Sequence, residues 1–119
     1  MTLVLIAIGA AIGAPLRYLV DRSVTSRARG RAFPWGLFTV NVVGSAVAAV
    51  VLATTTGDLR LLLTIGLCGA FTTFSGFGWE ALRLWSSARA AFWATVIGMP
   101  LACTAAFMLV WALLGGVSP

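Results

Sequence analysis

Four long apolar stretches follow one another along the chain. They cover residues 3–20, 35–56, 61–79 and 90–117, and Arg17 is the only charged residue inside them. A transmembrane helix needs about 20 apolar residues, and all four stretches are near or above that length. Because strict alternation of apolar and polar residues is absent, helices are expected rather than a membrane barrel. The first stretch has no preceding positive charge and runs on to Val20, which favours a membrane helix over a signal peptide.

The composition supports a membrane environment. Of the 119 residues, 61% are hydrophobic and 9% are charged, whereas a soluble domain carries about 25% charged residues. So few charges cannot cover a surface that faces water, and lipid is the expected surrounding. We therefore expect an all-α membrane protein with one domain, residues 1–119, and four transmembrane helices at about 3–22, 35–56, 60–86 and 89–116.

The arginines predict the orientation of these helices. The loop after the second helix holds only Arg60, whereas the first and third loops together hold six arginines: Arg22, Arg27, Arg29, Arg31, Arg83 and Arg89. The positive-inside rule then places the first and third loops in the cytoplasm and both termini outside. The net charge of +5 is therefore interpreted as an orientation signal. Nucleic-acid binding is not expected, because these arginines have little folded polar surface around them.

Two polar side chains at membrane depth need an explanation. Arg17 lies near the end of the first helix, where a charge costs less than the roughly 3 kcal/mol it costs at the membrane centre. It either extends to the interface or attracts anions at the mouth of a pore. Asn41 lies in the second helix, close to Gly44 and Ser45. Its amide either holds two helices together or offers an N–H donor to a polar path.

The segment 66–78 combines four glycines, three hydroxyl residues and three phenylalanines. Glycines and paired threonines weaken a helix, and hydroxyls can bond to carbonyls that a break leaves free. The segment therefore predicts a break in the third helix near residues 69–76, where backbone groups could bind ions. A small-residue packing face is the alternative interpretation. Glu80, just beyond, is expected at the interface, paired with Arg83.

Small residues suggest close packing of helices. Gly9 and Gly13 form a GxxxG pattern, which permits close approach of a second helix. Four short helices are too few to enclose a pore, so we expect a dimer and assign Gly9, Gly13 and Gly44 to packing between subunits. Cys68 and Cys103 lie in apolar stretches of a chain without histidine, and are expected to be packing residues rather than metal ligands.

Three motifs resemble those of the CrcB/Fluc family of small fluoride channels. They are G-A-P-L-R-Y at 13–18, W-G-L-F-T-V-N-V-V-G-S at 35–45 and G-L-C-G-A-F-T-T-F-S-G-F at 66–77. The resemblance implies fluoride conduction by a non-enzymatic, antiparallel dual-topology dimer in the lipid of the bacterial inner membrane. It also implies a sodium ion at the dimer interface, held by the carbonyls of Gly69 and Thr72. The implied anion pathway consists of Arg17, Asn41, Phe74, Ser75 and Phe77.

These side chains suit fluoride chemically. Fluoride is small and strongly hydrated, so a selective path must replace water with well-placed donors. The Asn41 N–H and the Ser75 O–H can donate directly. The ring edges of Phe74 and Phe77 carry partial positive charge, against which an anion can lie.

The chain departs from the family pattern in two places. Gly76 replaces a second hydroxyl, and Pro100 stands about where the family has a tyrosine, although Thr104 could substitute one turn later. The six-to-one arginine bias also suggests insertion in one direction and pairing with an oppositely oriented homologue. A small multidrug-type transporter is the chief alternative, but the first helix has no acid before Asp21. A non-transporting assembly subunit is the other alternative.

Overall fold

The computed structural model describes residues 1–116, and every regular element in that range is helical. The first two spans are α1 (Thr2–Arg27) and α2 (Trp35–Thr54). The third comprises α3 (Gly57–Leu61), the π-helix η1 (Leu62–Cys68), α4 (Gly69–Phe71) and α5 (Phe74–Ser87), and the fourth comprises α6 (Arg89–Trp93), the π-helix η2 (Ala94–Gly98) and α7 (Met99–Leu113). All four spans are long and apolar enough to cross a membrane, which confirms the predicted all-α architecture.

Three spans differ from their expected bounds by three residues or more. The third begins at Gly57 rather than at residue 60. The first helix continues past residue 22 to Arg27, because residues 23–29 include neither glycine nor proline, and it ends before Gly30, where φ is +81°. The fourth ends at Leu113, because Gly115 and Gly116 adopt φ values of +77° and +67°. Residue 117, the last of the fourth apolar stretch, lies outside the described residues.

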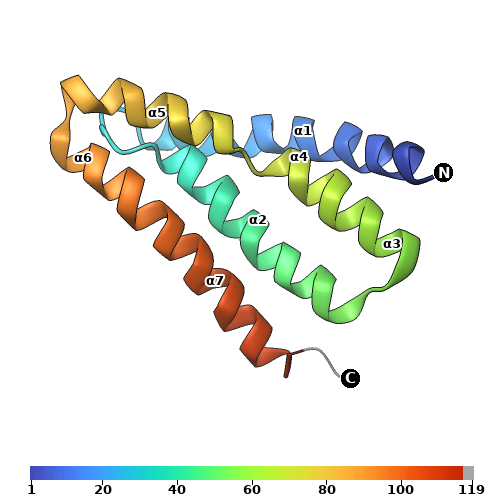
Figure 1. Cartoon of the computed structure of the whole chain (residues 1–119). Helices are drawn as coiled ribbons and strands as arrows, with labels where there is room; N and C mark the ends of the chain where they lie inside the picture. The colour runs from blue at the N-terminus through green and yellow to red at the C-terminus, as the bar shows by residue number, and fades with distance from the viewer. Residues whose placement is uncertain (117–119) are drawn as a thin grey trace.

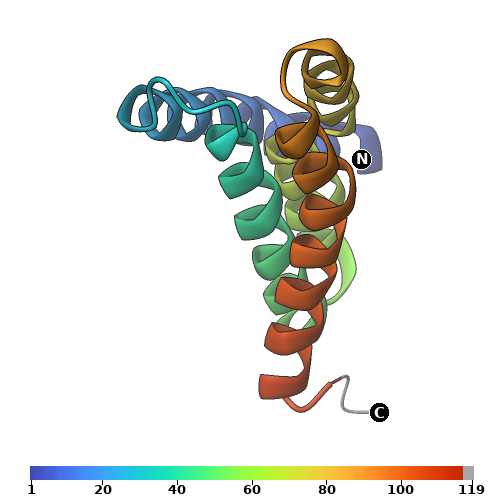
Figure 2. The same ribbon diagram turned by 90° about the vertical axis from the view of Figure 1, so that its left-hand side faces the viewer.

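The connections alternate between two ends of the molecule. Figure 1 shows the 28–34 loop and the α5–α6 corner at one end, and the α2–α3 connection at the other. Figure 2 shows α2 and α7 running side by side while α1 crosses them steeply. The arginines of the first and third loops therefore share one end of the molecule.

Arg60 holds the α2–α3 connection together. Its Nε donates to the Thr55 carbonyl at 2.7 Å, and its Nη2 donates to the Leu52 carbonyl at 2.9 Å. Both carbonyls belong to the end of α2, where the helix dipole favours a positive charge.

The glycines of α1 pack within the chain. Gly9 and Gly13 are buried against η1 and α4. A Cβ at Gly9 would lie 2.7 Å from the Leu67 nitrogen and 2.9 Å from the Gly66 Cα, and one at Gly13 would collide with the Leu67 carbonyl. This corrects the expectation that Gly9 and Gly13 pack between subunits. The GxxxG pattern permits close approach, but it does not specify which helix approaches.

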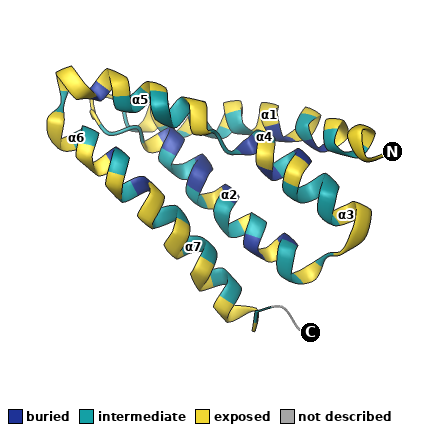
Figure 3. Cartoon of the chain, in the orientation of Figure 1, coloured by how far each residue is buried: buried dark blue, intermediate teal, exposed yellow. Residues whose placement is uncertain are grey.

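α2 is the most enclosed span. In its apolar window 39% of residues are buried, against 6–11% in the other three spans. Figure 3 shows the buried positions following α2, while the outer faces of the other helices are mostly exposed. The core consists of Leu37, Val40, Phe71 and Met99. A bundle with so much exposed apolar surface suits lipid or another apolar protein surface.

The π-helical turn η2 comes just before Pro100. Proline has no N–H to donate to the Val96 carbonyl four residues earlier, and its ring clashes with the preceding turn of an α-helix. A wider turn relieves this clash, as π-bulges do elsewhere in helices. Pro100 therefore changes the shape of the fourth span as well as its side-chain chemistry.

Candidate ion pathway at the helix break

The third span is interrupted at Thr72 and Thr73. Both residues have extended backbone, with φ/ψ of −79°/162° and −149°/122°. In Figure 1, α5 leaves this point in a different direction from α4. The Thr72 hydroxyl donates to the Cys68 carbonyl at 2.9 Å, and the Thr73 hydroxyl accepts from the Gly76 N–H at 3.1 Å. The predicted break is confirmed, and the two hydroxyls satisfy the helix ends on either side of it.

Asn41 of α2 braces this break. Its Oδ1 accepts from the Thr73 N–H at 2.9 Å, and its Nδ2 donates to the Thr73 carbonyl at 3.3 Å. Nδ2 also lies 3.5 Å from the Met99 sulfur, and the side chain is only 9% exposed. Asn41 therefore holds helices together, as one of its two interpretations proposed, and it also lines a cavity.

Gly69 has a carbonyl that the break affects directly. In a continuous helix this oxygen would accept from the Thr73 N–H, but that N–H is bonded to Asn41. Gly69 is exposed, and a Cβ there would meet only the Thr64 carbonyl, at 3.7 Å. Its main chain is therefore accessible from outside the subunit.

A lateral cavity of about 310 Å³ opens beside the break. It is lined by Asn41, Ser45, Thr72, Thr73, Phe74, Phe77, Met99, Pro100 and Cys103. The rings of Phe74 and Phe77 lie 5.7 Å apart, centroid to centroid, at 31°. Phe74 is 85% exposed, so its ring projects from the subunit.

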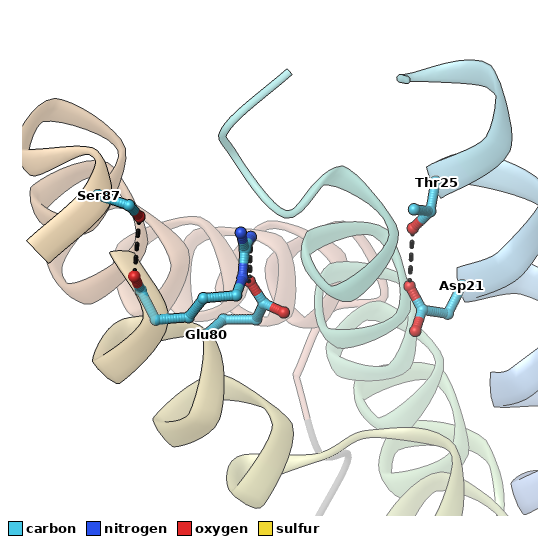
Figure 4. A network of polar contacts seen from close by, with 5 residues as sticks. Asp21, Thr25, Glu80 and Ser87 are labelled. Carbon is cyan, nitrogen blue, oxygen red and sulfur yellow. Dashed lines mark hydrogen bonds and ion pairs between the residues drawn. The ribbon is translucent and has the colours of Figure 1, made fainter. Parts of the chain in front are cut away.

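An arginine cavity of about 490 Å³ lies on the other side of the break, at the arginine-rich end. Its charged and hydroxyl lining residues are Arg17, Asp21, Thr25, Arg31, Thr73, Ser75, Glu80 and Arg83. Glu80 accepts from Arg83 Nη2 at 2.7 Å and from its Nε at 2.9 Å, as the sequence predicted. Figure 4 shows Glu80 on one side and Asp21 on the other, where Asp21 accepts a hydrogen bond of 3.1 Å from the Thr25 hydroxyl.

The two cavities share one lining residue among those described, Thr73. The predicted residues Arg17 and Ser75 lie in the arginine cavity, whereas Asn41, Phe74 and Phe77 lie in the lateral cavity. Thr104, the suggested substitute hydroxyl, lines neither of these two cavities. Gly44, expected between subunits, lies instead against the Thr72 side chain of its own chain.

Sequence reasoning did not single out Thr73, Arg31 or Met99 as lining residues. The sequence did carry a signal for Thr73, because threonine is a favoured N-cap residue and Thr73 directly precedes α5. Its hydroxyl also lies 3.2 Å from that of Ser75, so Thr73 provides a second hydroxyl near the position where Gly76 lacks one. Met99 carried none, because its role depends on a contact with Asn41, 58 residues away.

Residues 4–116 match the family model described as CrcB-like protein, Camphor Resistance (CrcB). The chain belongs to the CrcB-like protein family. It is 40% identical to the fluoride-specific ion channel FluC 1 of Streptomyces avermitilis, over 119 aligned positions that cover 93% of this chain and 94% of that one. It is 42% identical to the fluoride-specific ion channel FluC of Phocaeicola vulgatus over 103 positions, covering 82% and 84%.

A third relative, the fluoride-specific ion channel FluC of Chelativorans sp., is 42% identical over 111 positions, covering 84% of this chain and 88% of that one. The resemblance inferred from the three motifs is thereby confirmed. These relatives are channels by name, in agreement with the expectation that this chain is not an enzyme. Together with its four spans, membership of this family makes the chain a multi-pass membrane protein.

Proposed function

We propose that this chain is a subunit of a fluoride-selective channel in the bacterial inner membrane, which lets fluoride leave the cell passively and so relieves its toxicity. The observation that carries the proposal is the meeting of two cavities at Thr73, one lined with arginines and one with an amide and two phenyl rings. The CrcB-like relatives, all named fluoride-specific ion channels, support the choice of ion.

Electrostatics draws an anion first into the arginine cavity. Its lining holds three arginines (Arg17, Arg31 and Arg83) against two acids (Asp21 and Glu80), and this net positive charge raises the local anion concentration. Glu80 compensates much of the charge of Arg83. The hydroxyl of Ser75 and the amide of Asn41 then replace water around the ion. The ring edges of Phe74 and Phe77 stabilise it in the lateral cavity.

A second subunit completes the path. The lateral cavity opens to the outside of the subunit, and Phe74 projects from it. An antiparallel copy or homologue placed against this surface would enclose the cavity and exclude lipid from it. We propose such a dual-topology dimer as the working unit.

The carbonyls of Gly69 and Thr72 fit a sodium ion at the interface of that dimer. The Gly69 carbonyl lacks its helical donor and lies on an exposed surface, and hard cations prefer oxygen ligands. The described residues hold no cluster of three or more Asp, Glu, Cys or His side chains that could bind a metal ion. A sodium ion bound there would hold the two subunits together electrostatically.

The arginine bias favours a heterodimer. Six loop arginines lie at one end and Arg60 is the loop arginine at the other, so the positive-inside rule selects one orientation for this chain. A partner of opposite bias would supply the other orientation. Pro100 in the lateral cavity suits the same proposal, because a homologue could provide the hydroxyl that this position lacks.

The test is fluoride efflux from liposomes that contain the purified chain alone, an oppositely biased homologue alone, or both together. We expect selective fluoride efflux, with chloride retained, and the highest rate from the mixture. Robust efflux by the chain alone would exclude an obligate heterodimer. Efflux no faster than from protein-free liposomes in all three preparations would reject the channel function.

A further inference from the structure

The amide of Asn41 has one acceptor and two donor hydrogens, and all three have a partner. Oδ1 accepts from the Thr73 N–H, one Nδ2 hydrogen reaches the Thr73 carbonyl, and Nδ2 also lies within hydrogen-bond distance of the Met99 sulfur. The side chain is buried, so water does not compete strongly for these groups. Asn41 is thus bonded on both sides to the main chain of one residue.

This double contact occurs where the helix cannot satisfy its own main chain. Thr73 is extended, so its N–H does not bond to the Gly69 carbonyl as it would in a continuous α-helix. An unpaired N–H and C=O in apolar surroundings are unfavourable. The Asn41 amide replaces the lost helical bonds and so stabilises the extended conformation of Thr73.

The contact to Met99 differs in kind. A thioether sulfur is a weak acceptor, whereas a small anion accepts strongly from an amide. The Nδ2 hydrogen that rests on Met99 faces the lateral cavity, since both residues line it. It can therefore change partners more easily than the hydrogen bonded to Thr73.

We propose that Asn41 is a positioning residue that holds the break open through Thr73, and that Met99 is a replaceable acceptor for the single N–H that Asn41 offers to an anion. The role of Met99 rests on the proposed function, because the anion is fluoride. The role of Asn41 at the break concerns the chain without fluoride. Met99 then sets the affinity of the cavity, since the anion must displace its sulfur.

Hydrogen exchange at the Thr73 amide tests the first half, without fluoride. We expect Asn41→Ala to speed this exchange about tenfold, and Asn41→Asp, which keeps an acceptor oxygen, to leave it slow. Ser45→Ala is the matched control, because Ser45 lines the same cavity but bonds only to the Asn41 carbonyl of its own helix. Equal exchange in wild type and Asn41→Ala, or equally fast exchange in Asn41→Ala and Asn41→Asp, would overturn the proposal that Asn41 holds the break open.

Side-chain amide NMR of Asn41 during a fluoride titration tests the second half. One Nδ2 proton should shift and the other should stay. Met99→Leu should tighten the midpoint of that shift about threefold, since no sulfur competes. Met108→Leu, an exposed methionine of the same helix, should leave it unchanged. An unchanged midpoint in Met99→Leu, or a shift of neither proton while efflux persists, would overturn the role of Met99. Loss of efflux as well would reject the channel function. Hydrogen exchange at the Thr73 amide would still test whether Asn41 stabilises the extended conformation of Thr73.

Discussion

Gly44 of α2 lies directly against the side-chain methyl group of Thr72, the first extended residue of the break. A Cβ at Gly44 would fall on this methyl group and 3.2 Å from Cδ1 of Phe71. One turn earlier on the same helix, Asn41 reaches Thr73. The close approach that Gly44 permits is therefore what brings the Asn41 amide within bonding distance of the break.

Gly44→Ala should separate α2 from the break. Overpacking of this kind costs about 1–3 kcal/mol of stability, and we expect a lower thermal midpoint in detergent together with reduced fluoride efflux. Gly78→Ala is the matched control, because a Cβ at Gly78 of α5 meets nothing within 4 Å. It should be neutral or stabilising by up to about 1 kcal/mol, since alanine favours a helix more than glycine does. Equal midpoints for both variants would contradict the close contact.

Gly13→Ala should weaken the fold of each subunit rather than the association of subunits. The added methyl group would collide with the Leu67 carbonyl of the same chain. We expect a loss of about 1–3 kcal/mol that does not depend on protein concentration, measured by thermal unfolding over a wide dilution series. Ala11→Leu, at an exposed position of α1, provides the comparison. A loss that grows on dilution would instead place Gly13 between subunits.

Phe74→Ile and Phe77→Ile should each reduce fluoride efflux while leaving the protein folded and its state of association unchanged. Isoleucine keeps an apolar side chain of similar bulk but has no positive ring edge. We expect about a tenfold slower flux, which corresponds to a loss of about 1.4 kcal/mol of anion stabilisation. Size-exclusion chromatography checks that assembly is intact. Wild-type flux in both variants would favour a packing role for these rings, as expected of a non-transporting assembly subunit.

Glu80→Gln should make the arginine cavity more attractive to anions. The substitution removes the partner of Arg83 and leaves its positive charge uncompensated. Because the Arg83 side chain is half exposed, stability should change by less than about 1 kcal/mol. Fluoride efflux should rise at low ionic strength, and the difference should vanish at about 1 M salt, where charges are screened within about 3 Å. Identical rates at low salt would show that anions do not enter through this cavity.

The sequence predicts the helices and the break well, because both depend on local properties. Apolar length identifies each span, and the glycines and paired threonines before Phe74 weaken the helix where the structure interrupts it. Which helix packs against a given small-residue face is not set by the local sequence. Gly9 could have met any helix, and only the fold places it against Gly66.

The same reasoning explains what was missed in the site. Asn41 and Thr73 are 32 residues apart, and no spacing rule links an amide in one span to an extended residue in another. The assignment of Asn41 to either packing or an ion path stayed open in the sequence, because a single amide can serve both. In the structure, Oδ1 and one Nδ2 hydrogen of Asn41 bond to Thr73, and Nδ2 also contacts the Met99 sulfur.

The extended pair Thr72–Thr73 has a consequence for how this chain can diverge during evolution. The main-chain N–H and carbonyl groups of this pair are present whatever side chains occupy the positions, and only a substitution to proline would remove an N–H. Side chains around the break can therefore change while the stretch that both cavities share keeps its main-chain polar groups. Selection would act most strongly on the few residues that keep this stretch from closing into a regular helix.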